Sequence, residues 1–452
     1  MSQANRDPWT GEVRPFPRQT DAEVEARLAA AQAAFPAWSG RGINERAVLM
    51  HRVAKGLRDA RRDLAMTLTA EMGKLRREAL AEVEKSAAAC DYYADNAARY
   101  LQDQAIGTEA SRSYVRYAPI GCVLAIMPWN FPVWQVFRFL APGLMAGNVA
   151  LLKHATNVPS CADAIAEVLA AAGIPEGVFG VLHIDNEKAA DVIADPRVKA
   201  VTLTGSERAG RSVASTAGQH LKKCVLELGG SDPFIVLDDA DLDATVKVAV
   251  ASRFGNAGQT CIAAKRFIVT PGIADRFVQA FADAASKLVV GDPNDDASSL
   301  APMARADLRD ELHRQVQDSV AKGARVLLGG QPGQGETHYP ATILDAVKPG
   351  MPAWDEELFG PVASVLRVAD EAEAVRVAND TRYGLGASVW TADAARGERV
   401  ARQIDAGACF VNSLVKSDVR LPFGGTKASG FGRELAEHGM HEFTNIQTIY
   451  VA

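Results

Sequence analysis

The chain has 452 residues, of which 48% are hydrophobic and 23% are charged, and its net charge at pH 7 is −6. This length suits two or three domains with substantial cores, and the acidic balance without a basic block argues against a nucleic-acid partner. No apolar run reaches the roughly 20 residues that cross a bilayer, so we predict no membrane partner. The six cysteines are scattered and never form C-x-x-C, so we predict no disulfide framework, no metal site and a reducing, cytoplasmic compartment.

The first hundred residues have mostly helical patterns. Apolar side chains recur at helical spacing over residues 21–35 and 77–101. Asn44 is the predicted N-cap of another helix, which we expect to continue to Leu64.

From residue 113 onward, short apolar runs alternate with helical patterns. A strand at 113–117 comes before an alternating series of strands and helices that reaches Leu228, and a second series follows from Phe234. Such alternation indicates βαβ units and a parallel sheet. We therefore predict an α/β fold whose first series, at 123–228, is of the dinucleotide-binding type. The tail at 444–451 has strand character.

A glycine-rich approach leads to Cys261 in Phe254-Gly-Asn-Ala-Gly-Gln-Thr-Cys261. The small residues leave room for a substrate at the thiol, although an unpaired cysteine more often only packs in a core. Three other segments carry polar groups at predicted strand ends or turns. Asn130 is an amide donor suited to an oxyanion. Glu227 is an acid flanked by glycines and suited to general-base catalysis. The segment 204–210 is a strand-to-helix turn suited to phosphate, and a plain tight turn explains its glycines equally well.

Together these segments resemble the NAD(P)-dependent aldehyde dehydrogenase superfamily. Six motifs stand in that family's order across almost the whole chain: Met-Pro-Trp-Asn-Phe-Pro at 127–132, Thr-Gly-Ser at 204–206, Glu-Leu-Gly-Gly at 227–230, Gly-Gln-Thr-Cys at 258–261, Glu-Glu-Leu-Phe-Gly-Pro at 356–361 and Pro-Phe-Gly-Gly at 422–425. One such motif is weak evidence. Six in order are specific.

The resemblance assigns roles by position. It implies that Cys261 is the nucleophile, Asn130 the oxyanion donor and Glu227 the base that activates water. For the cofactor, NAD or NADP, it implies contacts from Trp129, Lys153, Thr156, Gly205, Ser206, Gly210, Glu357 and Phe359. The implied reaction forms a thiohemiacetal and then a thioester on Cys261, which water hydrolyses to the acid.

Within the superfamily, the segments 153–159, 224–234 and 441–448 resemble the shorter bacterial succinate-semialdehyde dehydrogenases. That substrate has a carboxylate, for which the resemblance implies Arg138, in an otherwise apolar helical segment. A second arginine of some relatives is replaced here by Gly255, so Arg420 or Lys416 could substitute. Ala263 stands where some relatives have a second, redox-active cysteine, and we predict no such disulfide.

Thr156 stands where NAD-selective relatives often have a glutamate that binds the adenosine ribose. A threonine does not repel a 2′-phosphate, and Lys153 is close by in sequence. We therefore expect NADP to be accepted, alongside NAD or in place of it.

Three alternatives remain at this point. A CoA-acylating dehydrogenase would use the cysteine, but such relatives typically lack the base at Glu227. The substrate could be another aldehyde, such as glutarate semialdehyde or a medium-chain aldehyde. A non-catalytic homologue is the third, and the complete set of Asn130, Glu227 and Cys261 argues against it.

The resemblance also implies a Rossmann-like cofactor domain, an α/β catalytic domain and a small β oligomerisation flap. The expected boundaries are 1–106 and 127–228 for the cofactor domain, 229–420 for the catalytic domain, 107–126 and 436–452 for the flap, and 421–435 for a return to the cofactor domain. Because the flap would expose a strand edge, we expect a homodimer or homotetramer.

Overall fold

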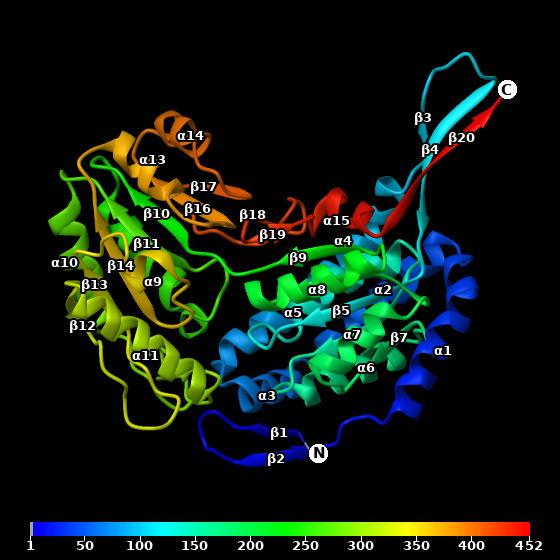
Figure 1. The fold of residues 1–452 in the computed structure, drawn as a ribbon, viewed down its shortest axis with the longest axis horizontal. Helices are drawn as coiled ribbons and strands as arrows, with labels where there is room; N and C mark the ends of the chain where they lie inside the picture. The colour runs from blue at the N-terminus through cyan, green and yellow to red at the C-terminus, as the bar shows by residue number, and fades with distance from the viewer. Residues whose placement is uncertain (1–2) are drawn as a thin grey trace.

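The computed structural model describes residues 3–452 (Figure 1). Two lobes, each built on a twisted sheet, lie side by side, and a β-ribbon carries the C-terminus away from the body. Among the described residues, no helix combines the length and the apolar character needed to cross a membrane.

The first lobe is built on a six-stranded sheet in the order β19-β9-β8-β5-β6-β7. All neighbours pair in parallel except β19 and β9, which confirms the predicted βαβ series. The strands are β5 (Cys122–Met127), β6 (Val149–His154), β7 (Phe179–Val181), β8 (Val198–Thr204), β9 (Lys223–Glu227) and β19 (Gly430–Phe431), and the helices that alternate with them are α5 (Trp134–Met145), α6 (Pro159–Ala171), α7 (Asn186–Ala194) and α8 (Glu207–Gln219).

Four N-terminal helices pack on the same core: α1 (Asp21–Ser39), α2 (Ile43–Asp59), α3 (Arg61–Met72) and α4 (Arg76–Tyr100). Two details differ from the sequence prediction. The N-cap of α2 is Gly42, whose N–H donates to Glu45, so Asn44 already lies inside the helix. The helix also ends at Asp59, and a new helix begins at Arg61, so Leu64 belongs to α3. An N-terminal hairpin that the sequence did not predict pairs β1 (Gln3–Arg6) with β2 (Val13–Phe16).

The second lobe is built on a seven-stranded sheet in the order β12-β13-β14-β11-β10-β16-β17. Only β12 runs antiparallel to its neighbour. The strands are β10 (Asp232–Val236), β11 (Ala264–Val269), β12 (Arg325–Leu328), β13 (Thr342–Asp345), β14 (Val362–Arg367), β16 (Gly386–Trp390) and β17 (Ala408–Val411). The helices are α9 (Leu242–Phe254), α10 (Ala274–Ala285), α11 (Ala306–Ala321), α12 (Pro352–Asp355), α13 (Glu371–Asn379) and α14 (Ala394–Ala401).

The projecting ribbon contains β20 (Thr444–Val451), β4 (Arg112–Pro119) and β3 (Gln104–Ala105), all antiparallel (Figure 1). β20 follows α15 (Ala436–Glu442). The expected flap boundary at residue 126 is too late, because β5 lies in the middle of the six-stranded sheet, with β6 and β8 as neighbours.

Two connections join the lobes. The chain passes from β9 directly into β10, and it returns through β18 (Thr426–Lys427), which pairs with β15 (Tyr383–Gly384), before it reaches β19 (Figure 1). The carboxyl ends of β5 and β9 therefore belong to the first lobe, whereas the loop after α9 belongs to the second. Side chains from both lobes can meet at this junction.

Candidate active site

The loop that carries Cys261 begins where α9 ends. A 3-10 turn at Gly255–Gly258 follows, in which Asn256 and Ala257 have positive φ angles of 54° and 52°. Non-glycine residues adopt this conformation only when surrounding contacts hold it. Arg253, fully buried, supplies such contacts by donating to the carbonyl oxygen of Gly258 at 2.8 Å and to others nearby.

Asn130 lies directly against this loop. Its Nδ2 donates to the carbonyl oxygen of Gln259 at 3.0 Å, and its own carbonyl accepts from the side chains of Lys74 and Asn256, each at 3.0 Å. The amide carries a second N–H, as an oxyanion donor requires. The predicted oxyanion donor is therefore hydrogen-bonded to Gln259, which comes two residues before the predicted nucleophile, Cys261.

Buried Glu82 positions the segment after Asn130. One of its carboxylate oxygens accepts from the N–H groups of Val133 and Trp134, at 2.8 and 3.0 Å, at the start of α5. The other pairs with Lys74, which also holds the carbonyl of Asn130. The sequence did not single out Lys74 or Glu82, because two charges among many on a helix look like a solvated surface.

Cys261 lines a cavity of about 330 Å³ together with aromatic side chains, including Phe131, Trp134 and Phe423. Burial raises the pKa of the thiol to about 11, while the charges of Arg138 and Lys265 act in the opposite direction. The two cations therefore favour the thiolate, which is the nucleophilic form.

Glu227 ends β9 and is buried, and neither of its carboxylate oxygens has a hydrogen-bond partner among the described residues. Burial raises its pKa well above the usual range, and the nearby carboxylate of Glu434 raises it further. A carboxyl group with a raised pKa holds a proton more readily near neutral pH, as acid–base catalysts do.

Arg138 lies in the same cavity lining but is already paired. It is 2% exposed, forms an ion pair with Glu434, donates to the Thr204 hydroxyl at 3.1 Å and stacks over the Phe423 ring at 4.7 Å. A buried arginine needs an anionic partner, and the resemblance implied that the substrate carboxylate would be that partner. The structure shows that Glu434, which the sequence did not single out, pairs with Arg138 within the chain.

Arg420 does not line this cavity. Its side chain is 72% exposed and pairs with Asp418 at 2.7 Å. Two lysines do line it: Lys85 from α4, which the sequence did not single out, and Lys416.

Several predicted cofactor residues lie at strand ends of the first lobe. Lys153, at the end of β6, is buried and donates to Asn186 at 3.0 Å. Ser206 caps α8 by accepting from the Ala209 N–H, and the turn after β8 lies at the N-terminus of this helix, a setting that suits phosphate. Gly210, which the resemblance assigned to the cofactor, has a packing role in the structure. Any side chain there would overlap Leu228, so this glycine serves close packing of α8 on the chain between the lobes.

Thr156 is exposed in the loop after β6 and lines a separate cavity of about 560 Å³ beside the N-terminal hairpin. The amide of Asn157, which has no hydrogen-bond partner among residues 3–452, lies next to it in the same lining. The structure therefore does not bring Thr156 into the cavity that holds Cys261.

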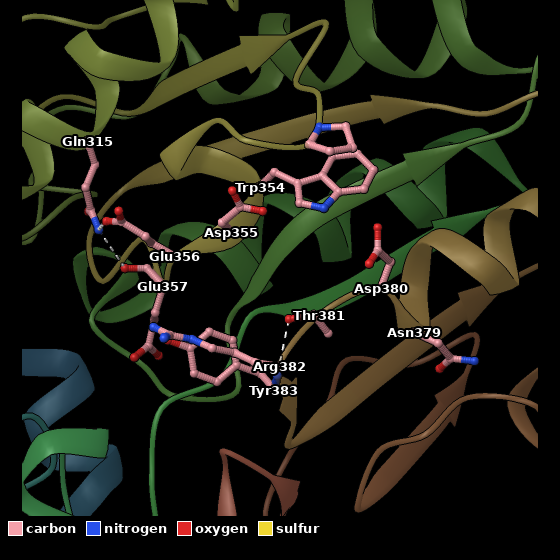
Figure 2. A pocket seen from close by; sticks show the side chains of 11 residues that line it. Gln315, Trp354, Asp355, Glu356, Glu357, Asn379, Asp380, Thr381, Arg382 and Tyr383 are labelled. Atoms are coloured by element: carbon pink, nitrogen blue, oxygen red, sulfur yellow. Dashed lines mark hydrogen bonds between the residues drawn. The ribbon is translucent and has the colours of Figure 1, made fainter. Parts of the chain in front are cut away.

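Glu357 and Phe359 come from the second lobe; Glu357 contacts the chain between the lobes, and Phe359 contacts a residue of the first lobe. Glu357 pairs with Lys265 at 3.1 Å and accepts from the Gly230 N–H at 3.0 Å, and Phe359 packs edge-to-face on Trp129 at 5.8 Å. A cavity of about 800 Å³ opens beside Glu357, and Figure 2 shows Gln315 next to Glu356 and Glu357 in its lining. A free helix N-terminus, a buried lysine and a carboxylate are groups that fit the phosphates and riboses of a dinucleotide.

The comparisons with known proteins agree with this geometry. Residues 2–449 match the aldehyde dehydrogenase family. This chain belongs to the aldehyde dehydrogenase family.

Relatives within the family are similar over their full length. The chain is 49% identical to the succinate semialdehyde dehydrogenase [NAD(P)+] Sad of Escherichia coli K12, over 98% of this chain and 96% of the relative. It is 48% identical to the succinate-semialdehyde dehydrogenase [NADP(+)] 1 of Mycobacterium ulcerans, with complete coverage of both. The crystal structure of the succinic semialdehyde dehydrogenase of Streptococcus pyogenes with NADP+ superposes with a TM-score of 0.97 at 39% identity, covering 99% of each chain. The aldehyde dehydrogenase fold predicted from the motifs is thus confirmed.

Proposed function

We propose that this aldehyde dehydrogenase oxidises succinate semialdehyde to succinate with NADP or NAD. One observation carries the proposal: Cys261 and the cations Lys85, Arg138 and Lys416 line the same cavity. The thiol and a cation that binds a carboxylate can therefore contact the two ends of one small molecule. The relatives named for this substrate support it, since they align over the full length.

In the reaction, the Cys261 thiolate adds to the aldehyde carbon while the Asn130 amide donates to the oxygen that becomes negative. Loss of hydride from this carbon leaves a thioester on Cys261, and a bound nicotinamide would supply the acceptor for that hydride. Glu227 takes a proton from water, the water attacks the thioester, and the acid and the free thiol are released. The balance is aldehyde, water and oxidised cofactor to acid, reduced cofactor and a proton.

The cofactor would bind across the junction of the lobes. Lys153 and the N-terminus of α8 suit the ribose and phosphates, and Glu357 suits the nicotinamide ribose. Thr156 carries no charge that would repel a 2′-phosphate, which favours acceptance of NADP. The ratio of kcat/KM for NADP and NAD tests this, and an overwhelming preference for NAD would contradict it.

We infer that the chain forms a homo-oligomer through its projecting ribbon, although the number of subunits is left open. In β20, the side chains of Ile446, Tyr450 and Val451 are 65%, 51% and 41% exposed. β20 is also the edge strand of its sheet, so its outer edge pairs with no other described strand. Such an edge is usually covered by another chain. The domain division we propose takes the first sheet with α1–α4 as the cofactor domain, the second sheet as the catalytic domain, and β3, β4 and β20 as the flap.

The substrate assignment is tested by comparing kcat/KM for succinate semialdehyde, glutarate semialdehyde and butanal. We expect succinate semialdehyde to be preferred over uncharged butanal by at least about 100-fold, since a buried charge pair is worth a few kcal/mol. Cys261→Ala is the control and should be inactive with every substrate. Equal efficiency with butanal would refute the substrate, and full activity of the variant would refute the mechanism.

A further inference from the structure

The cavity that contains Cys261 has three cationic side chains in its lining, and they differ in how their charge is balanced. Arg138 pairs with Glu434 inside the protein. Lys85 and Lys416 form no ion pair among the described residues. A substrate carboxylate gains most from a cation whose charge is not already neutralised.

Lys85 is fixed in place by two neighbouring segments. Its Nζ donates to the hydroxyl of Ser417 at 2.7 Å and lies over the ring of Trp134, 4.1 Å from the centroid. Trp134 belongs to α5, and Ser417 to the loop after β17, so α4, α5 and that loop converge on this ammonium. Lys416 is exposed, as Lys85 is, but it makes no side-chain hydrogen bond in the part of the chain that the structure describes.

The acids near Lys85 all have other partners. Glu82, one turn earlier in α4, pairs with Lys74 and caps α5. Asp418, next to Ser417, pairs with Arg420. The charge of Lys85 is therefore left without a local counter-ion.

The surroundings of Lys85 disfavour its charged form. The side chain is exposed toward the open cavity, and the groups packed around its ammonium, the Trp134 ring and the Ser417 hydroxyl, take the place of part of its water. Burial, followed by the charge of Arg138, lowers the pKa of Lys85 to about 8. An ammonium that is partly dehydrated and unpaired gains free energy when an anion binds beside it.

We propose that Lys85, together with the hydroxyl of Ser417, binds the carboxylate of the acidic aldehyde substrate and so determines the preference for it. The inference rests on the proposed function and assigns to Lys85 a contact additional to the one that the resemblance implies for Arg138. Arg138, which also lines the cavity, is already paired with Glu434 and favours the Cys261 thiolate.

The test compares Lys85→Met, Lys85→Arg and Lys416→Met with the wild-type enzyme, using succinate semialdehyde and butanal. In Lys85→Met, we expect KM for succinate semialdehyde to rise about 30- to 100-fold with kcat changed less than about threefold, and kcat/KM for butanal to stay level or rise. Lys85→Arg should recover most of the loss because it restores the charge. Equal losses with both aldehydes, or no loss with either, would overturn the proposal, as would a larger rise of KM in Lys416→Met.

A binding measurement supplies a readout that does not depend on turnover. Succinate should slow the alkylation of Cys261 by iodoacetamide in the wild-type enzyme, and about 30-fold more succinate should be needed in Lys85→Met. Unchanged protection in a variant with a normal melting curve would contradict the assignment. A variant that melts early is replaced by Lys85→Gln, and the same criterion applies.

The outcomes separate the two proposals. If the wild-type enzyme shows no preference for succinate semialdehyde over butanal, the proposed function fails. If the wild-type preference is present but persists in Lys85→Met, the proposed function stands and the role of Lys85 is wrong.

Discussion

Lys265 and Glu357 form an ion pair, 3.1 Å between Nζ and Oε1, directly behind the loop that carries the nucleophile. The same ammonium donates to the carbonyl oxygens of Thr260 and Cys261, at 2.9 and 2.6 Å. The thiol loop and the carboxylate proposed to hold the nicotinamide ribose are thus tied to one buried cation. This contact links the position of Cys261 to that of the cofactor.

Lys265→Met should make Cys261 less reactive. Lys265 lowers the pKa of the thiol and Glu357 raises it. Loss of the cation should therefore raise the pKa further, and a rise of about one unit would slow alkylation by iodoacetamide at pH 8 about tenfold. Glu357→Gln is the matched control with the opposite sign, because it removes the charge that disfavours the thiolate. If both variants change the rate of Cys261 alkylation in the same direction, the charges of Lys265 and Glu357 do not explain the reactivity of the thiol.

Gly229→Ala should impair cofactor binding. A methyl group at Gly229 would overlap the carboxylate of Glu357, which accepts a hydrogen bond from the next residue, Gly230. We expect KM for NADP and NAD to rise about tenfold or more, with little change in the alkylation of Cys261 without cofactor. Gly218→Ala, where a methyl group meets open space in α8, is the control. Normal cofactor affinity in Gly229→Ala would contradict the role of Glu357.

Glu227→Gln should separate the two halves of the reaction. Without the base, hydrolysis of the thioester slows and kcat should fall about 100- to 1,000-fold, while one reduced cofactor per site still forms rapidly. Since the pKa of Glu227 is raised, the fraction of its basic form grows as pH rises, so wild-type kcat should rise with pH. The variant should lack this rise. A variant that loses the rapid burst as well would place Glu227 in the first step instead.

The pH dependence of KM tests the charge state of Lys85. Its pKa is lowered to about 8, so the free side chain is charged below that pH and neutral above it. KM for succinate semialdehyde should accordingly rise between about pH 7 and pH 9.5, because only the charged form attracts the carboxylate. The groups that face it are Arg138, Glu82, Asp418 and Cys261, and the thiol, with a pKa of about 11, titrates above this window.

Two comparisons control that profile. KM for butanal should stay level over the same range, since butanal has no charge. In Lys85→Arg, KM for succinate semialdehyde should also stay level, because a guanidinium remains protonated. A rise of equal size for butanal would assign the effect to another group.

Much of this molecule could be predicted from sequence because periodicity and motif order are local properties. The helices at residues 21 and 77 and the βαβ series after residue 122 followed from apolar spacing. The N-terminal hairpin did not, since β1 and β2 have only four residues each and show no alternating apolar pattern. The flap boundary was wrong because β4 and β5 are almost continuous in sequence but enter different sheets.

In the site, the motif residues around Cys261 could be located, but the pairing of charges could not. Whether Arg138 is free to bind a substrate depends on Glu434, which lies almost 300 residues away and forms an ion pair with it only in the folded chain. The same holds for Lys85, whose neighbours Trp134 and Ser417 come from two other segments. Partners that distant in sequence leave no local pattern.

The central claim is that Cys261 carries the substrate through the reaction as a thioester. The most direct test mixes Glu227→Gln with succinate semialdehyde and NADP, stops the reaction with acid and measures the mass of the peptide that contains Cys261. The account predicts that this peptide gains the mass of one succinyl group, in step with one reduced cofactor per site. Reduced cofactor formed without any acylated Cys261, or a succinyl group on another residue, would contradict it.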